Sequence, residues 1–196
     1  MPPKINKANL KEDIANSCEE AISKEAMNIA KKTLNKKLEK YLNDIDNHPV
    51  SQELSKGPDG TNTTNTLGGR ANLFAFIGFD AAEKPIENLK RIIKNNTFLD
   101  KKGQFNTKTF EINFDIFTPS LEEIKSETPL PFENGKSWVK GIEDGISGFG
   151  YYVYGLLFRK SRSGRGIQSK NKIRTAIYRP IKYMSEIYSN FIRSLQ

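Results

Sequence analysis

The sequence predicts an α+β fold with a long N-terminal helix, a small and mostly antiparallel sheet packed by helices, and an amphipathic C-terminal helix. Three observations carry this prediction. Apolar residues recur at helical spacing over residues 9–46, "KTFEINFDIF" alternates apolar and polar residues, and helical spacing returns over residues 184–195. We expect two regions, the long helix with its terminal turn at 1–54 and an α+β domain at 55–196.

The first helix carries an apolar stripe whose members follow one another at steps of three, four and five residues, and no Pro or Gly interrupts it. The stripe consists of Leu10, Ile14, Cys18, Ile22, Ala26, Ile29, Leu34, Leu38, Leu42 and Ile45. At about 1.5 Å per residue this helix is longer than a domain of 196 residues is wide. We therefore expect part of it to project or to pack on another chain. The alternative is a kinked helix, or two helices, wrapped on the chain's own core.

The middle of the chain is expected to alternate loops, helices and strands. Pro49 ends the first helix near Asn47, "SQEL" makes a short helical turn, and residues 55–71 form a long polar loop. The apolar run "NLFAFIGF" (72–79) predicts a buried strand, Pro85 begins a helix, and "KKGQ" makes a turn. The strand in "KTFEINFDIF" is expected to have a buried apolar face and a wet polar one. The apolar face holds Phe110, Ile112, Phe114 and Ile116, and the polar face holds Glu111, Asn113 and Asp115.

Further helices and a basic excursion are expected toward the C-terminus. Thr118 and Pro119 predict the N-cap and first residue of a helix in "TPSLEEIKSET". Apolar residues four apart from Trp138 favour a short helix, although glycines weaken it. "FGYYVYGLLF" (149–158) predicts a strand. Residues 159–174 form a basic, hairpin-like loop before the last helix.

The net charge of +8 is concentrated near the C-terminus, where residues 146–196 hold ten basic residues and one acidic residue. This indicates an acidic or polyanionic partner; a solvated basic loop without a partner is the alternative. The loop contains no interleaved aromatic residues, so we expect contact with phosphates rather than base stacking. The candidate partner-facing or DNA-facing residues are Arg159, Lys160, Arg162, Arg165, Lys170, Lys172 and Arg174.

Residues suited to catalysis are few. The single cysteine, Cys18, lies on the apolar stripe and is expected to be a buried small hydrophobe, and the single histidine, His48, to make a hydrogen bond at a helix end. One Cys and one His exclude a zinc site of usual spacing, and the carboxylates of 111–115 and 143–144 are expected to be solvated rather than magnesium ligands. "GPDGTNTTNTLGG" lacks the phosphate-loop pattern. We expect no enzyme, no cofactor and no metal.

The sequence contains no apolar run as long as the roughly 18–20 residues of a membrane-spanning helix. Its N-terminus, "MPPKINKANLKEDIANS", has no apolar segment of the kind found in secretory signals. We therefore expect an intracellular site of synthesis and no membrane partner.

The order of these motifs resembles the tail-completion or neck proteins of tailed bacteriophages, a family of head–tail joining proteins. The resemblance rests on three segments: "NHPVSQEL", "TLGG" before "NLFAFIGF", and "GIEDGISGFGYY" with "SRSGRGIQ". In the second segment the residues near the T-G-x-L turn of that family are Thr66, Leu67, Gly68, Gly69 and Leu73. It implies a non-enzymatic structural virion protein, present in the host cytoplasm during assembly. Such a subunit forms a homo-oligomeric ring, expected to be a hexamer, between the portal or adaptor and the tail tube or sheath.

Two functional hypotheses follow. The first is this head–tail connector, neck or tail-completion (tail terminator) subunit, in which a polar loop lies on a neighbouring subunit. The loop residues with this expected role are Thr61, Asn62, Thr63, Thr64, Asn65, Thr66, Gly68 and Gly69. The second is a sequence-independent nucleic-acid-binding protein that uses residues 159–174.

Overall fold

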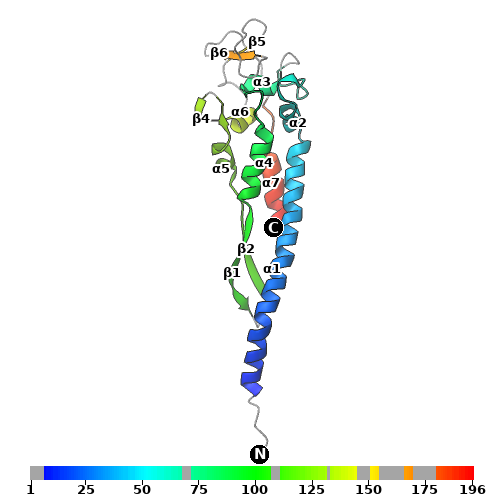
Figure 1. Ribbon diagram of the computed structural model, residues 1–196, viewed down its shortest axis with the longest axis vertical. Helices are drawn as coiled ribbons and strands as arrows, with labels where there is room; N and C mark the ends of the chain where they lie inside the picture. The colour runs from blue at the N-terminus through cyan, green and yellow to red at the C-terminus, as the bar shows by residue number, and fades with distance from the viewer. Residues whose placement is uncertain are drawn as a thin grey trace, which may run out of the picture.

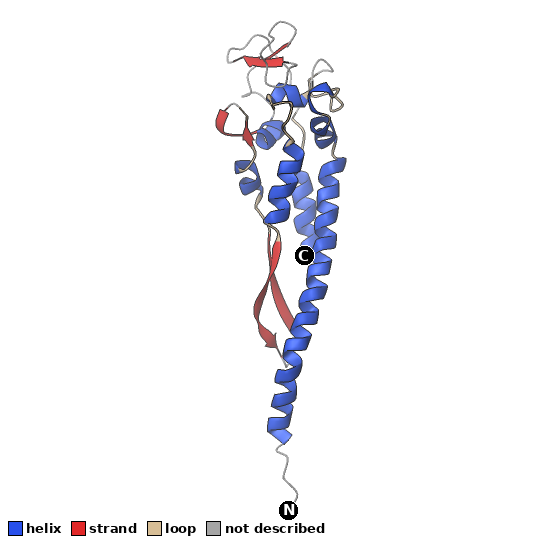
Figure 2. Ribbon diagram, viewed as in Figure 1, coloured by secondary structure: helices blue, strands red, loops and turns tan. Residues whose placement is uncertain are grey.

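The protein has a mixed helix and strand fold drawn out along one long axis, as the computed structural model in Figure 1 shows. The structure describes residues 7–67, 72–106, 111–131, 133–144, 151–154, 166–169 and 180–196. Within these residues there are seven α-helices, one short 3-10 helix and three separate two-stranded antiparallel pairs (Figure 2). The α+β prediction is therefore confirmed, with small strand pairs in place of a single sheet.

Helix α1 (Lys7–Asn47) forms the long axis of the molecule, and its 41 residues confirm the predicted long helix. At 1.5 Å per residue it is about 60 Å long. Among the α1 side chains that the structure describes, the buried ones lie in its C-terminal part, from Leu34 through Leu38 and Tyr41 to Ile45. The N-terminal part extends away from the other helices (Figure 1). We call this part of α1, together with the strand pair beside it, the stalk.

The expected single apolar stripe on α1 is wrong. Ile22 and Ile29 are 41% and 59% exposed, whereas Leu34 is 5% exposed. The five-residue step from Ile29 to Leu34 turns the helix by about 140°, so the apolar side chains change face at that step. Cys18 lies near the two isoleucines and is exposed, so its expected burial is also wrong.

The chain turns after α1 through two short helices. Helix α1 ends at Asn47 as expected, and α2 (Pro49–Ser55) follows with His48 as its N-cap. A 3-10 turn, η1 (Gly57–Asp59), then leads into the polar loop.

The expected strand at 72–79 is a helix, α3 (Leu73–Ile77). Its five residues are all buried, so no solvent-facing side reveals the helical period. Its ends carry ordinary helix signals. The Asn72 side chain caps the N-terminus, and Gly78 ends the helix in the left-handed region with φ 88°, which glycine adopts without steric cost.

Helix α4 (Pro85–Asn95) begins at Pro85 as expected and buries Ile86, Leu89 and Ile93. After it, β1 (Phe98–Asn106) and β2 (Glu111–Phe117) pair antiparallel into a ribbon beside α1 (Figure 1). The predicted strand is confirmed, but the expected turn "KKGQ" lies within β1. The expected buried face is wrong for its described residues, because Ile112 and Phe114 are half-buried and Ile116 is 38% exposed. A two-stranded ribbon on one helix has too little neighbouring structure to cover a face.

Helix α5 (Leu121–Ser126) begins two residues later than expected, because Ser120 rather than Thr118 is its N-cap. Ser120 and Glu123 form a reciprocal capping box, which satisfies two backbone N–H groups at once. The short pair β3 (Pro129–Leu130) and β4 (Glu133–Ser137) leads into α6 (Trp138–Asp144), which confirms the expected short helix.

Strand β5 (Tyr151–Tyr154) lies inside the expected tyrosine-rich strand and pairs with β6 (Gly166–Ser169). The amphipathic C-terminal helix is confirmed as α7 (Met184–Leu195), which buries Met184, Ile187 and Phe191. Helix α7 runs alongside α1 (Figure 1), and the Phe191 ring stacks on that of Tyr41 with centroids 4.3 Å apart. The core therefore lies between the C-terminal part of α1, α7 and the short helices above them.

Candidate functional site

The polar loop at the end of α2 is held by its own chain through one buried carboxylate. Glu53 on α2 is 0% exposed. It accepts hydrogen bonds from the Asn62 amide at 2.8 Å, from the Thr64 backbone N–H at 2.9 Å and from the Thr64 hydroxyl at 2.8 Å. It also accepts one from the Leu73 backbone N–H at 2.8 Å, at the start of α3. One side chain thus joins α2, the loop and α3.

Inside the loop, side chains alternate between inward and outward positions. Asn62, Thr64 and Thr66 face inward, where the Asn62 amide lies 3.1 Å and 3.2 Å from the two threonine hydroxyls. The Asn62 carbonyl oxygen accepts from the Leu67 backbone N–H at 3.0 Å. These three residues are therefore held by hydrogen bonds within their own chain.

The outward edge of the loop consists of the exposed residues Thr61, Thr63 and Asn65. Asn65 has φ 52°, a left-handed conformation that Asn tolerates better than most residues. The role of the loop between subunits stays a prediction, and these three residues are now its candidates. Gly68 and Gly69 lie outside the described residues.

Asn72 holds the other side of the loop. Its amide donates to the Pro58 and Gly60 carbonyls at 2.8 Å and 2.7 Å, while its carbonyl oxygen accepts from the Ala75 N–H at 2.7 Å. Sequence reasoning missed both Glu53 and Asn72. An Asn directly before an apolar run is an N-cap signal, but nothing local marks Glu53, because its partners lie nine to twenty residues away in the sequence.

The seven basic residues of the expected partner-facing loop lie outside the described residues: Arg159, Lys160, Arg162, Arg165, Lys170, Lys172 and Arg174. Their expected contacts therefore stay predictions. Strand β6, which lies between them in the sequence, contains only uncharged residues.

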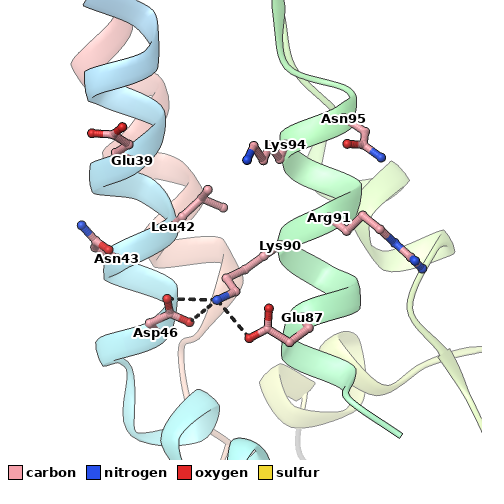
Figure 3. Close-up of a pocket in the computed structure, with 9 residues that line it drawn as sticks. All are labelled: Glu39, Leu42, Asn43, Asp46, Glu87, Lys90, Arg91, Lys94 and Asn95. Carbon is pink, nitrogen blue, oxygen red and sulfur yellow. Dashed lines mark hydrogen bonds and ion pairs between the residues drawn. The ribbon is translucent and has the colours of Figure 1, made fainter.

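A groove of about 690 Å³ lies between α1 and α4 (Figure 3). Lys90 points across it from α4, with its Nζ 3.0 Å from Asp46 Oδ1 on α1 and 3.1 Å from Glu87 Oε1. Partial burial lowers the pKa of Lys90, but the bonds to Asp46 and Glu87 outweigh it and raise that pKa above its usual value. The groove is lined by three acidic and three basic side chains together with Leu42, Asn43 and Asn95. Its balanced charge favours neither an anion nor a cation, and its Lys90–Asp46 ion pair joins α4 to α1.

Two residues considered for catalysis, His48 and Glu143, each make a hydrogen bond to the backbone. His48 accepts from the Val50 N–H at 3.2 Å through Nδ1, which confirms its expected hydrogen bond at a helix end. Glu143 accepts from the Ser185 N–H at 2.6 Å and so joins α6 to α7. Among the residues that the structure describes, no group of three or more His, Cys, Asp or Glu side chains is placed to hold a metal ion.

The stalk carries the largest uncovered apolar side chains of the described residues. Five large hydrophobic residues are exposed: Ile22, Ile29, Phe98, Ile116 and Phe117. The first two lie on α1 and the other three on the ribbon. Phe98 and Phe117 are cross-strand partners whose rings stack with centroids 5.0 Å apart. Adjacent exposed rings such as Phe98 and Phe117 mark a contact surface more often than scattered apolar residues do.

In the described part of the chain, every helix is too short or too polar to cross a bilayer. The chain matches no family model, no curated protein and no solved structure.

Proposed function

We propose that this chain is a structural subunit of a tailed-bacteriophage virion, a connector, neck or tail-completion subunit in a ring between the portal and the tail. The observation that carries the proposal is the ribbon beside α1, whose apolar side chains Phe98, Ile116 and Phe117 are uncovered within one chain. An assembly subunit requires such surfaces, because its contacts are completed by neighbouring copies. The order of motifs from "NHPVSQEL" to "SRSGRGIQ" supports the particular assembly.

Neighbours in a ring meet through two different surfaces of the same subunit. The stacked pair Phe98 and Phe117 supplies one candidate surface on the ribbon. The outward loop edge of Thr61, Thr63 and Asn65 supplies a second on another part of the fold. The loop is held by Glu53 before assembly, so a neighbour meets an ordered edge, which lowers the entropic cost of contact.

The test is a nonsense mutation in the gene, in the phage that carries it. The expected result is filled heads and complete tails that stay separate, and purified protein added to the extract joins them into infectious particles. Electron microscopy of negatively stained samples counts joined and separate particles. Phe98→Ser with Phe117→Ser is expected to lower the yield of joined particles, whereas Asn113→Ser, at an exposed polar position of β2, serves as the matched ribbon control. Normal virions without the protein would reject the proposal.

The concentration of basic residues in 146–196 favours a second candidate function, sequence-independent binding of nucleic acid. Replacing Arg162 and Arg165 by Ala is expected to weaken DNA binding and to lower the salt dependence of the binding constant by about one unit of slope per residue. The control replaces the exposed Lys84 and Lys140, which removes the same charge elsewhere. No measurable DNA binding at low salt would exclude this function.

A further inference from the structure

A second face of α1 is turned away from the chain's own core. The residues buried against α7 and the short helices begin at Leu34, whereas Ile22 and Ile29 are 41% and 59% exposed. These two residues are seven apart, so they lie about 20° from one another around the helix and about 120–140° from Leu34. Cys18 and Thr33 are exposed near the same line. We call the face that carries these four residues the outward face.

The outward face has the seven-residue repeat of a coiled-coil seam. Ile22, Ile29 and Lys36 occupy one seam position and are exposed. Glu19, Ala26 and Thr33 occupy the other, three residues before each; of these Thr33 is exposed and Glu19 and Ala26 are half-buried. Large and small side chains alternate along the seam, and a charged residue stands at each end. A seam of this composition fits another helix laid along it, because each isoleucine requires a small residue opposite.

The charge along α1 indicates which helix fits. Residues 12–25 hold five acidic residues and one basic residue, and residues 31–40 hold five basic residues and one acidic residue. Two copies of α1 laid parallel place like charges together at both ends. Two copies laid antiparallel place the acidic segment of each copy against the basic segment of the other. The two contacts are equivalent, because a two-fold axis relates the copies.

We propose that two copies of this chain pair through the outward face of α1 in antiparallel orientation. In this register Ile22 of one copy lies opposite Thr33 of the second, and Ile29 lies opposite Ala26. Glu19 faces Lys36 at each end of the seam, and Glu25 flanks Lys32 beside it. The two-fold axis repeats each of these facing pairs once. Every pair along the seam therefore joins a large side chain to a small one, or an acidic side chain to a basic one.

This pairing goes beyond the proposed ring and does not rest on it. Neighbouring subunits of a hexameric ring are related by a rotation of 60°, which turns α1 by at most that angle. An antiparallel pair is therefore a contact of the free protein. The ring proposal uses the ribbon and the loop edge, and its extract assay responds to those surfaces. Failure of the antiparallel pair in sedimentation or cross-linking experiments therefore leaves the ring proposal standing, and the extract assay tests that proposal separately.

Sedimentation velocity over a range of protein concentrations measures the pair. Wild type is expected to shift reversibly from monomer to dimer as concentration rises. Replacing Ile22 and Ile29 by Gln, which keeps helix propensity, is expected to raise the dimer dissociation constant by about tenfold or more. Ile116→Gln on the ribbon is the matched control and is expected to leave it unchanged. Circular dichroism at equal concentration shows whether α1 is intact in each variant.

Cross-linking measures the orientation. Two chains are prepared on a Cys18→Ser background, one with Ile22→Cys and one with Thr33→Cys. In the proposed register a mixture forms disulfide-linked dimers, whereas each variant alone does not, because its two thiols lie about 16 Å apart along the axis. Efficient cross-linking of each variant alone, without linkage in the mixture, would indicate a parallel pair and overturn the proposal. A wild-type chain that sediments as a monomer at every concentration overturns it as well.

Discussion

Among single residues, Glu53 joins three segments of the chain, α2, the polar loop and α3. A carboxylate with no exposure is costly unless its oxygens receive hydrogen bonds, and Glu53 receives them from Asn62, Thr64 and Leu73. Only an ionised carboxylate offers two acceptor oxygens without a donor of its own. The loop therefore requires this residue type, and a close isostere does not replace it.

Glu53→Gln is expected to lower the free energy of unfolding by about 2–4 kcal/mol, since one oxygen becomes an NH₂ group that faces other donors. The exposed Glu39 on α1 provides the matched control, and Glu39→Gln is expected to change stability by less than about 0.5 kcal/mol. Urea denaturation followed by circular dichroism measures both variants. Equal midpoints for Glu53→Gln and wild type would contradict this role.

His48 makes the stability of the fold depend on pH. Burial lowers the pKa of its imidazole below the ordinary value of 6.5, against the opposing effects of a hydrogen bond to the Lys182 backbone and of nearby Glu186. The neutral ring also accepts from the Val50 N–H through Nδ1, which a protonated Nδ1 cannot do. The folded state thus takes up a proton at lower pH than the unfolded state does.

The contribution of His48 is therefore complete above pH 6.5 and is lost as pH falls from 6.5 toward the lowered folded-state pKa. Wild type is expected to lose more unfolding free energy between pH 7.5 and 5.5 than His48→Asn does, because Asn caps the helix without titrating. Urea denaturation at both values measures the difference, and an equal loss in the two proteins would count against it.

At the scale of elements, α3 is held in place by both the amide nitrogen and the carbonyl oxygen of the Asn72 side chain. Asn72→Ala removes both the cap on the Ala75 N–H and the bonds to the Pro58 and Gly60 carbonyls, and is expected to cost about 2–3 kcal/mol. Asn72→Asp keeps the cap but places a carboxylate against those carbonyl oxygens. It is expected to destabilise at least as much as Ala does. A wild-type melting curve for the Asp variant would show that the cap alone matters.

The elements also show where sequence patterns are informative. The predictions of α1, α4, α6 and α7 are confirmed, because each carries apolar residues at helical spacing, and Pro85 marks the start of α4. The pattern failed at Leu73–Ile77, where every side is buried and the period is lost. It also failed for burial on β2, because alternation tells which side chains share a face but not whether another element covers that face.

The candidate contact surfaces were harder to predict than the elements. Steps of three to five residues do not separate the outward face of α1 from the core stripe, because the five-residue step from Ile29 to Leu34 changes the face by about 140°. The Glu53 site joins residues up to twenty positions apart, and only the folded backbone brings them together. Charge counting located a basic segment at 159–174, and its contacts lie beyond the described residues.

At the scale of the whole molecule, stability is expected to fall along α1 from its C-terminal part to the stalk. Residues 34–45 pack on α7, whereas residues 18–33 hold no buried side chain among those described. Hydrogen–deuterium exchange in dilute solution is expected to be much slower over 34–45 than over 18–33, since opening the stalk exposes little apolar surface. Protection of the stalk that rises with protein concentration fits the antiparallel pair. Uniform protection at the lowest concentration would contradict the gradient.

The stack of Phe191 on Tyr41 has a consequence for synthesis of the chain. A ribosome makes Phe191 150 residues after Tyr41, on the order of ten seconds later at usual elongation rates. Until then Leu34, Leu38 and Tyr41 have no α7 to cover them, although α1 itself forms within microseconds. Nascent chains on one messenger RNA therefore expose this apolar face of α1 close to one another. A chain that stops before α7 keeps the face accessible to chaperones and proteases.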